Sequence, residues 1–345
     1  MSSCLESILT SDVVVLGAGL IGLSIALELN TRGASVTVVD RWQSLTGASS
    51  AAAGMLAADD PGNRPQLREF SRLSAALYPA FLSRLEALSG IAVPFQTSTT
   101  VQYLADGTTV RLPEHSLDPR QLAAAVLAAV RATSVRLLEY TRVTSIQQQG
   151  RGSIVQVRDA VPIAADAIIY AAGAWTTETM TLLHAEPIYV TPCKGQMLRV
   201  RLPFPLDEVH RSERIYICPR TVGPNAGTAL IGATVEDAGF DTSVHPTDLN
   251  SLRALAAELL PAFASEAQVP TVESWAGLRP ATPDKLPILG ATSRPGHLIA
   301  TGHYRNGILL APATALSMAD LLEGKSPAID LSALSPQRFT LSTTS

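Results

Sequence analysis

The apolar positions near the start of the chain form two short runs, at residues 13–16 and, interrupted only by Thr37, at 36–39, instead of an alternating pattern. Runs of this kind are typical of strands that are buried on both faces, as in a parallel sheet. The segment between them, residues 20–32, has the length and apolar content of a helix, and Gly33 is placed to end it. The pattern predicts a strand, a helix and a second strand, which together form a βαβ unit.

The rest of the chain mixes helical and strand patterns and changes character in its middle third. Helical periodicity occurs at residues 67–88, 118–132 and 246–260, and strand patterns occur at 93–104, 135–139, 143–147, 154–157, 166–170 and 297–302. Asp118 and Pro119 have the residue types of an N-cap and a first helical position. Between residues 186 and 275 prolines are frequent and apolar positions alternate with period two, which predicts an antiparallel sheet. The tail beyond Pro327 is expected to be peripheral.

The order of these elements predicts an α/β protein with two domains. A chain of 345 residues is longer than a single hydrophobic core normally supports. We expect a discontinuous Rossmann-like domain formed by residues 1–90, 113–185 and 276–345. Residues 91–112 and 186–275 are expected to form a second domain, a cap built on an antiparallel sheet.

Composition narrows the possible functions. The net charge is −4 at pH 7 and no Lys/Arg cluster stands out, which argues against a nucleic-acid partner. The first 12 residues carry no basic side chain and glycines break the apolar run that follows, so neither a signal peptide nor a membrane span is predicted. Cys4, Cys193 and Cys218 lack a CxxC spacing, and the six histidines form no HExxH or HxH pair. We therefore expect a cytoplasmic protein without a metal site.

The turn after the first predicted strand carries the sequence GAGLIG at residues 17–22. In a dinucleotide-binding turn, Gly17 permits the tight bend, Gly19 lets a pyrophosphate approach the backbone, and Gly22 lets the helix pack against its strand. Asp40, at the end of the second strand, is placed to accept hydrogen bonds from a ribose. Because the strand, the helix and the acid agree, cofactor binding is predicted here.

Three further segments support cofactor binding, and the last of them favours FAD over a nicotinamide cofactor. Residues 47–56 are mostly alanine, serine and glycine, which suits backbone that lies against a flat ligand, and a flexible linker is the alternative. A second apolar strand ends in small residues at Gly173. The last helix starts at residues 305–307, where its N-terminus can stabilise negative charge on a reduced flavin, and an ordinary capped helix is the alternative. A nicotinamide oxidoreductase that uses only the first turn stays open.

Five segments together carry a resemblance to a known family. They are GAGLIG at 17–22, SSAAAGML at 49–56, IYICPR at 215–220, WAGLRP at 275–280 and GHYRNGILLAP at 302–312. With these segments the chain resembles the glycine oxidases within the D-amino-acid oxidase family of FAD-dependent oxidoreductases, and the match spans almost the whole chain. The segments at 49–56 and 302–312 are the most specific, whereas the first motif occurs in many unrelated flavin and nicotinamide proteins.

The resemblance implies a set of contacts to a non-covalently bound FAD, since no cysteine lies in the last of these segments. Leu20 and Ile21 fall at the pyrophosphate, Asp40 and Arg41 at the ribose, and Val143 at the adenine. Together with the glycines of the turn and of the second strand, the predicted cofactor residues are Gly17, Gly19, Leu20, Ile21, Gly22, Asp40, Arg41, Ala48, Ser49, Ala53, Gly54, Met55, Val143, Gly173, His303, Tyr304, Arg305, Asn306, Gly307, Ile308 and Leu309.

For the substrate, the resemblance implies that Arg279 pairs with a carboxylate, Tyr216 hydrogen-bonds it, and Arg305 lies close by. A guanidinium suits this task because its planar fork meets a carboxylate through two parallel hydrogen bonds, which lysine cannot reproduce. A surface role for Arg279, a helix-capping role for Arg305 and a packing role for Tyr216 are the structural alternatives. Val235 stands where the family member compared has methionine, so the volume beside the substrate Cα is expected to differ.

The activity that the resemblance implies is oxidation of a small amino acid or amine, with O₂ reduced to hydrogen peroxide. Glycine would give an imine and then glyoxylate and ammonia, and the same imine can feed the thiazole branch of thiamine synthesis. A sarcosine or D-amino-acid oxidase, or a dehydrogenase that passes electrons to a quinone, is the closest alternative. A catalytically silent flavin-binding module is another. The sequence leaves the oligomeric state open, including a homo-oligomer.

Overall fold

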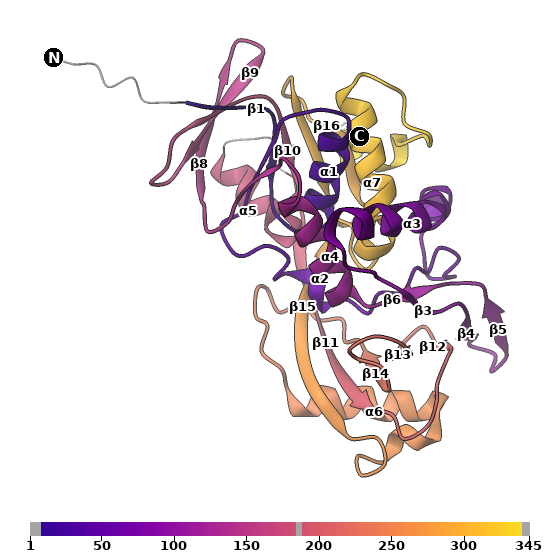
Figure 1. The fold of residues 1–345 in the computed structure, drawn as a ribbon. Helices are drawn as coiled ribbons and strands as arrows, with labels where there is room; N and C mark the ends of the chain where they lie inside the picture. Colours follow the sequence, from indigo (N-terminus) through magenta and orange to yellow (C-terminus); the bar gives the residue numbers. More distant parts are fainter. Residues whose placement is uncertain (1–7, 184–187, 340–345) are drawn as a thin grey trace, which may run out of the picture.

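The computed structural model describes residues 8–183 and 188–339, and Figure 1 shows two regions stacked one above the other. The upper region is built on a mixed sheet with the strand order β16–β17–β10–β1–β2–β7, to which β9 and β8 add beside β10. Its strands are β1 (Leu9–Leu16), β2 (Val36–Val39), β7 (Arg136–Leu138), β8 (Val143–Gln149), β9 (Gly152–Val157), β10 (Ile163–Tyr170), β16 (Ile288–Ala291) and β17 (His297–Thr301). The five strands from β17 to β7 run parallel, so the predicted βαβ start of a Rossmann-like sheet is confirmed.

Both faces of this sheet are covered, which explains why the second half of β1, residues 13–16, is apolar at every position. Val13 and Val15 pack into a core with four helices, whereas Val14 and Leu16 pack on the opposite face with β8, β9 and α5. The four helices are α1 (Leu20–Thr31), α3 (Arg68–Ser89), α4 (Pro119–Arg131) and α7 (Gly307–Leu322), and α5 is Thr176–Leu182. None of the described helices is both long and apolar enough to cross a lipid bilayer.

The lower region is a cap built on a second sheet, with the strand order β15–β11–β14–β13–β12–β4–β5. The strands are β4 (Thr100–Tyr103), β5 (Thr109–Leu112), β11 (Thr191–Arg201), β12 (Val209–Arg211), β13 (Tyr216–Arg220), β14 (Thr228–Gly232) and β15 (Thr271–Ala281). Helix α6 (Pro246–Leu259) covers one face of this sheet through Leu252 and Ala256. The pairing is antiparallel as predicted except between β12 and β4, which run parallel and are far enough apart in sequence for the crossover that a parallel pair requires.

The remaining short elements are α2 (Ala48–Ala51), β3 (Phe95–Thr97), β6 (Ser116–Leu117) and the 3₁₀ turns at Pro65–Leu67, Gly173–Trp175, Pro261–Ala264, Ser332–Leu334 and Pro336–Phe339. In Figure 1, β15 and β11 run from the junction of the two regions down into the cap. The predicted domain boundaries stay a prediction. The boundary between residues 275 and 276 falls within strand β15, and the boundary between residues 185 and 186 lies outside the described residues.

Two local features bear on expectations from the sequence. The small-residue segment 47–56, for which a flexible linker was the alternative, contains a helical turn, α2. The tail beyond Pro327 is not wholly peripheral, because Leu334 is 1% exposed and belongs to the main core. The side chain of Arg338 fixes this tail by donating to both carboxylate oxygens of Asp284 and to the carbonyl of Leu334. The tail was misjudged because its few apolar residues show no periodicity.

Candidate active site and cofactor pocket

The turn between β1 and α1 has room only for glycine at two of its positions. Gly17 has a φ of +117°, and a Cβ there would lie 2.4 Å from the carbonyl oxygen of Ala171. A Cβ on Gly22 would lie 2.0 Å from the carbonyl oxygen of Gly17. The turn therefore packs directly against the end of β10 and against the first turn of its own helix, as a dinucleotide-binding turn requires.

Asp40 lies at the end of β2 and holds this turn in place. Its carboxylate accepts hydrogen bonds from the backbone N–H groups of Ala18, at 2.7 Å, and Trp42, at 2.9 Å. Burial raises the pKa of Asp40, and these two hydrogen bonds oppose that shift. Since each carboxylate oxygen can accept two hydrogen bonds, Asp40 retains capacity for a ribose hydroxyl.

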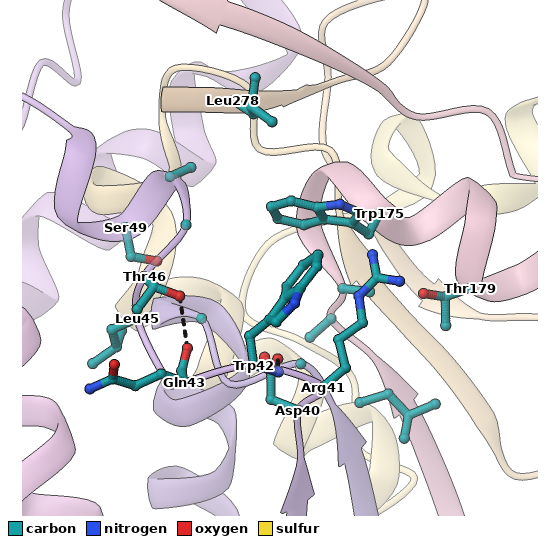
Figure 2. Close-up of a pocket in the computed structure, with 18 of the residues that line it drawn as sticks. Asp40, Arg41, Trp42, Gln43, Leu45, Thr46, Ser49, Trp175, Thr179 and Leu278 are labelled. Carbon is teal, nitrogen blue, oxygen red and sulfur yellow. Dashed lines mark hydrogen bonds between the residues drawn. The ribbon is translucent and has the colours of Figure 1, made fainter. Parts of the chain in front are cut away.

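A cavity of about 930 Å³ opens beside this turn and extends to β15 of the cap. Figure 2 shows Asp40, Arg41 and Trp42 on one side of it and Leu278 at the opposite end. The predicted cofactor residues that line it are Gly17, Gly19, Asp40, Arg41, Ala48, Ser49, Val143 and Gly173. Of the other residues predicted for the pyrophosphate turn, Leu20 is buried and its N–H donates to Ser49 Oγ at 2.9 Å, while Ile21 packs against the core.

An aromatic wall of the cavity was missed at the level of sequence. It consists of Trp42, Trp175 and Phe240, with Trp42 and Trp175 edge to face at 4.8 Å and Trp175 and Phe240 stacked at 5.6 Å between ring centroids. Arg41 lies 4.0 Å from the Trp42 ring centroid and donates two hydrogen bonds to Glu178. The two tryptophans follow directly after Asp40-Arg41 and Gly173-Ala174, which was the available sequence signal. Phe240 comes from the cap and had none.

The segment around Gly54 lies against β6 and is held from behind by the cap. Gly54 has a φ of +85°, and a Cβ there would lie 2.0 Å from the carbonyl oxygen of Leu117. The carbonyl of Ala53 accepts a hydrogen bond of 2.7 Å from the guanidinium of Arg220, which is fully buried. Met55 forms an isolated β-bridge with Ser116. The predicted flavin-side residues Ala53, Gly54 and Met55 thus form a fixed edge between the two regions.

The start of α7 places the remaining predicted cofactor residues. His303 is buried and its Nε2 lies 3.0 Å from Thr314 Oγ1, and burial lowers its pKa to about 3. Tyr304 has a φ of +49°, and Asn306 donates to Asn63 Oδ1. Gly307 opens the helix, and the side chains of Ile308 and Leu309 lie in the main core. Any contact of these last two residues with a cofactor therefore falls to their backbone.

The structure brings Arg279 and Tyr216 together on the cap. The guanidinium of Arg279 donates to the carbonyl oxygens of Lys194, at 3.2 Å, and Thr234, at 3.0 Å. Within the described residues, no carboxylate lies within ion-pair distance of it. Burial raises the pKa of Tyr216 to about 12, and the neighbouring charge of Arg279 lowers it in part. A half-buried cation and a neutral hydroxyl that interact electrostatically are thus available on the cap for a small anion.

Arg305 takes a different position from Arg279. Its guanidinium pairs with Asp60 at 3.0 Å and its side chain is 41% exposed. Burial raises the pKa of Tyr304, and the charges of Arg279 and Arg305 oppose that shift, so both arginines act electrostatically on this tyrosine. Val235 is 68% exposed. The roles of Arg305 and Val235 toward a substrate stay predictions.

The cavity fits a dinucleotide in size and in its lining. Ligand cavities range from roughly 300 to 1,000 Å³, and this one lies at the upper end. A Cβ built on Gly19 would meet only Ser49 Oγ, at 3.5 Å, so bare backbone faces the cavity where the helix begins. The N-terminal N–H groups of a helix are suited to a pyrophosphate. Within the described residues, no group of three or more metal-ligating side chains is found.

Comparison with known proteins decides the family. A family model described as FAD dependent oxidoreductase, DAO, matches residues 12–114 and 107–321. The chain belongs to this family. As a member of the DAO family it is an FAD-dependent oxidoreductase, and the predictions of the family, the cofactor and the fold class are confirmed.

Individual relatives in the DAO family match most of the chain. A glycine oxidase from Geobacillus kaustophilus is 32% identical, over 95% of this chain and 97% of its own length. The crystal structure of glycine oxidase from the same species matches with a TM-score of 0.88 and 31% identity, over 94% of this chain and 98% of that chain. A bifunctional protein ThiO/ThiG from Nostoc sp. is 36% identical over 91% of this chain but 53% of its own length. The chain thus spans about half the length of that relative.

Proposed function

We propose that the protein oxidises glycine, or a closely related small amino acid, with O₂ as the electron acceptor. The observation that carries this proposal is the guanidinium of Arg279, which has no carboxylate partner among the described residues and lies next to the neutral hydroxyl of Tyr216. Leu278, the residue before Arg279 on β15, lines the cofactor cavity, whereas Arg279 and Tyr216 are not among its lining residues, so the pair lies on the cap beside the cavity. The relatives named glycine oxidase support the same substrate class.

In the overall reaction, glycine, O₂ and water give glyoxylate, ammonia and hydrogen peroxide. FAD, when bound, supplies the redox chemistry by accepting the Cα hydrogen of the substrate as a hydride and passing the electrons to O₂. The residues that would hold it are those of the turn at Gly17–Gly22, Asp40, and the edge at Ala53–Met55. The task left to the chain is positioning, which is the main source of rate in a reaction that needs little acid–base assistance.

Arg279 and Tyr216 divide the binding of the substrate carboxylate between them. The fork of Arg279 offers two parallel N–H donors, and its charge is not spent on an internal acid. Tyr216 retains its proton well above neutral pH, so its hydroxyl is able to donate. We also expect the imine to feed the thiazole branch of thiamine synthesis, in line with the names of the bifunctional relatives.

The test is to measure peroxide formation by the purified flavin-loaded protein with glycine, sarcosine, D-alanine and D-proline. We expect the highest kcat/KM with glycine. A higher value with sarcosine or a D-amino acid would transfer the proposal to that substrate class. Rapid reduction of an artificial dye without O₂ consumption would identify a dehydrogenase. Absence of both activities with all four substrates would overturn the proposal.

The role of Arg279 is tested by Arg279→Ala. Removal of one charged partner of a desolvated carboxylate costs about 2–5 kcal/mol, and we expect kcat/KM for glycine to fall accordingly. The matched control is Arg214→Ala, because Arg214 also belongs to the cap but is 62% exposed and pairs with Glu258. An unchanged kcat/KM in Arg279→Ala would show that this guanidinium does not bind the substrate.

A further inference from the structure

Lys194 is a buried lysine on β11, and it follows Cys193, the residue that pairs with Arg279 across the β11–β15 ladder. Its side chain is 1% exposed, and its ammonium pairs with Asp241 at 3.1 Å and with Glu236 at 3.5 Å. Successive residues of a strand point to opposite faces, so Lys194 lies on the face opposite to Cys193, the partner of Arg279 across the ladder. A lysine is rarely buried so completely unless its charge is paired, as it is here.

The two acids that pair with Lys194 belong to one segment, residues 233–245, which follows β14 and is called the cap loop here. The backbone of Glu236 forms a two-way bridge with Lys194, with both N–H to carbonyl distances at 3.0 Å. Gln196, two residues further along β11, donates to Glu236 Oε1 and accepts from the backbone N–H of His245. The backbone N–H of Gln196 donates to Thr234 Oγ1 at 2.7 Å. The cap loop is thus fastened to β11 by one buried charge and several hydrogen bonds.

Arg279 contacts both segments that are joined in this way. Both carbonyl oxygens that accept hydrogen bonds from its guanidinium, those of Lys194 and Thr234, belong to the two segments that the lysine joins. Among the described residues, these two backbone carbonyls are the hydrogen-bond acceptors of the Arg279 guanidinium. Its direction therefore depends on how closely the cap loop is held against β11.

The same loop also supplies part of the cavity wall. Phe240 and Thr242 line the cofactor cavity, and Phe240 stacks on Trp175 of the Rossmann-like region. Asp241, which pairs with Lys194, lies between these two residues in sequence. The lysine thus holds one segment that touches the substrate guanidinium at one end and the cofactor cavity at the other.

We propose that Lys194 is a positioning residue for substrate binding, which fixes the cap loop against β11 and thereby aims Arg279 at the carboxylate. The inference rests on the proposed function only in taking Arg279 as the carboxylate partner. Loss of the ammonium removes the attraction that holds the two cap-loop carboxylates, Glu236 and Asp241, against β11, and their mutual repulsion, no longer screened by a cation, rearranges the loop. The carbonyl of Thr234 then leaves Arg279, and the guanidinium loses its direction.

The test compares Lys194→Met with Asp241→Asn, which breaks the same ion pair from a half-exposed position and leaves β11 intact. Two quantities are measured on the flavin-loaded proteins: KM and kcat for glycine, and the Kd of glycolate from the change that it causes in the flavin absorption spectrum. Glycolate carries the carboxylate of glycine but has a hydroxyl in place of the amine. In Lys194→Met we expect KM and the glycolate Kd to rise roughly tenfold or more, because misplacement of a binding group by about 1 Å costs up to about 100-fold. In Asp241→Asn both quantities should change in the same direction. In both variants kcat should fall less than about threefold.

The matched control is Lys325→Met, because Lys325 also pairs with an acid, Glu323, but lies exposed beyond α7. It should leave both quantities unchanged. Lys194→Arg, which retains the charge, should restore the glycolate Kd toward that of the unaltered protein. Unchanged KM and glycolate Kd in Asp241→Asn, or a loss confined to kcat, would overturn the inference. Glycolate binding needs no turnover, so an unaltered protein that binds glycolate without oxidising glycine would overturn the proposed reaction while leaving this inference testable.

Discussion

At the scale of single residues, the candidate substrate site depends on two glycines, whose lack of a side chain leaves space for Arg279 and Tyr216. A Cβ on Gly195 would lie 2.2 Å from a guanidinium nitrogen of Arg279, and a Cβ on Gly232 would lie 2.4 Å from the hydroxyl of Tyr216. Neither glycine has a positive φ, so the constraint is space and not backbone conformation. Each of the two functional side chains lies flat over the glycine of a neighbouring strand. A glycine inside a strand often marks a close approach of this kind.

Gly195→Ala is therefore expected to weaken substrate binding while leaving the cofactor in place. The added methyl group overlaps the guanidinium of Arg279 and forces it away from its two carbonyl acceptors. We expect KM for glycine to rise about 10- to 100-fold, because displacement by about 1 Å is enough for such a loss. Steady-state kinetics give KM, and the flavin absorption band of the purified protein reports cofactor retention. A variant with an unaltered KM would mean that Arg279 has room to move without consequence.

At the scale of elements, the sequence predicted what local patterns determine. The βαβ start and the helix that Asp118 caps are confirmed, because apolar runs, glycines and an N-cap residue act within a few positions of each other. The parallel pairing of β12 with β4 and the burial of Leu334 were missed because both depend on contacts between distant segments. The two carbonyl oxygens that hold Arg279 were missed for the same reason. No pattern in the sequence shows which way a carbonyl in a distant strand points.

Asp118, the N-cap residue of helix α4, also joins the Rossmann-like region to the cap region. Its carboxylate accepts from the backbone N–H of Arg120, at 2.9 Å, and from Asn225 of the cap, at 2.7 Å, and lies 3.9 Å from the buried guanidinium of Arg220. Asp118→Ala removes the helix cap, worth about 1 kcal/mol, and leaves Arg220 without its anion, where loss of one partner of a buried pair costs about 3–5 kcal/mol.

The matched variant for this element is Asp118→Asn, which retains an acceptor oxygen for the helix but removes the charge. We expect urea unfolding to show a larger loss of stability in Asp118→Ala than in Asp118→Asn, with both below the unaltered protein. Equal stability of all three would mean that neither the cap nor the buried charge contributes to folding.

At the scale of the whole molecule, the two regions form one cavity between them. The Rossmann-like region supplies the glycine turn and Asp40, while the cap supplies Phe240 and the strand that carries Arg279. Contacts that join the regions, such as Arg220 to the carbonyl of Ala53, lie behind the cofactor edge and not in the cavity itself. The stability of the whole fold and the shape of the cavity are therefore linked.

The stability of this fold should fall on mild acidification because of a histidine buried in the large sheet. His297, on β17, lies between Ser153 Oγ and the hydroxyl of Tyr170, both at 3.0 Å, and burial, aided by the charge of Arg294, lowers its pKa to about 4. Between its ordinary pKa near 6.5 and about 4, the unfolded chain binds a proton that the folded chain does not. Above about pH 6.5 His297 is neutral in both states, and its burial does not lower the free energy of unfolding. As the pH falls from about 6.5 toward 4, the free energy of unfolding decreases by at most about 1.4 kcal/mol per pH unit for this one proton. His297→Gln removes this titratable group. The free energy of unfolding of the variant, measured by urea titration at several pH values, should therefore depend less steeply on pH between about 6.5 and 4 than that of the unaltered protein. An equal slope in both proteins would show that His297 titrates alike in the folded and unfolded chains.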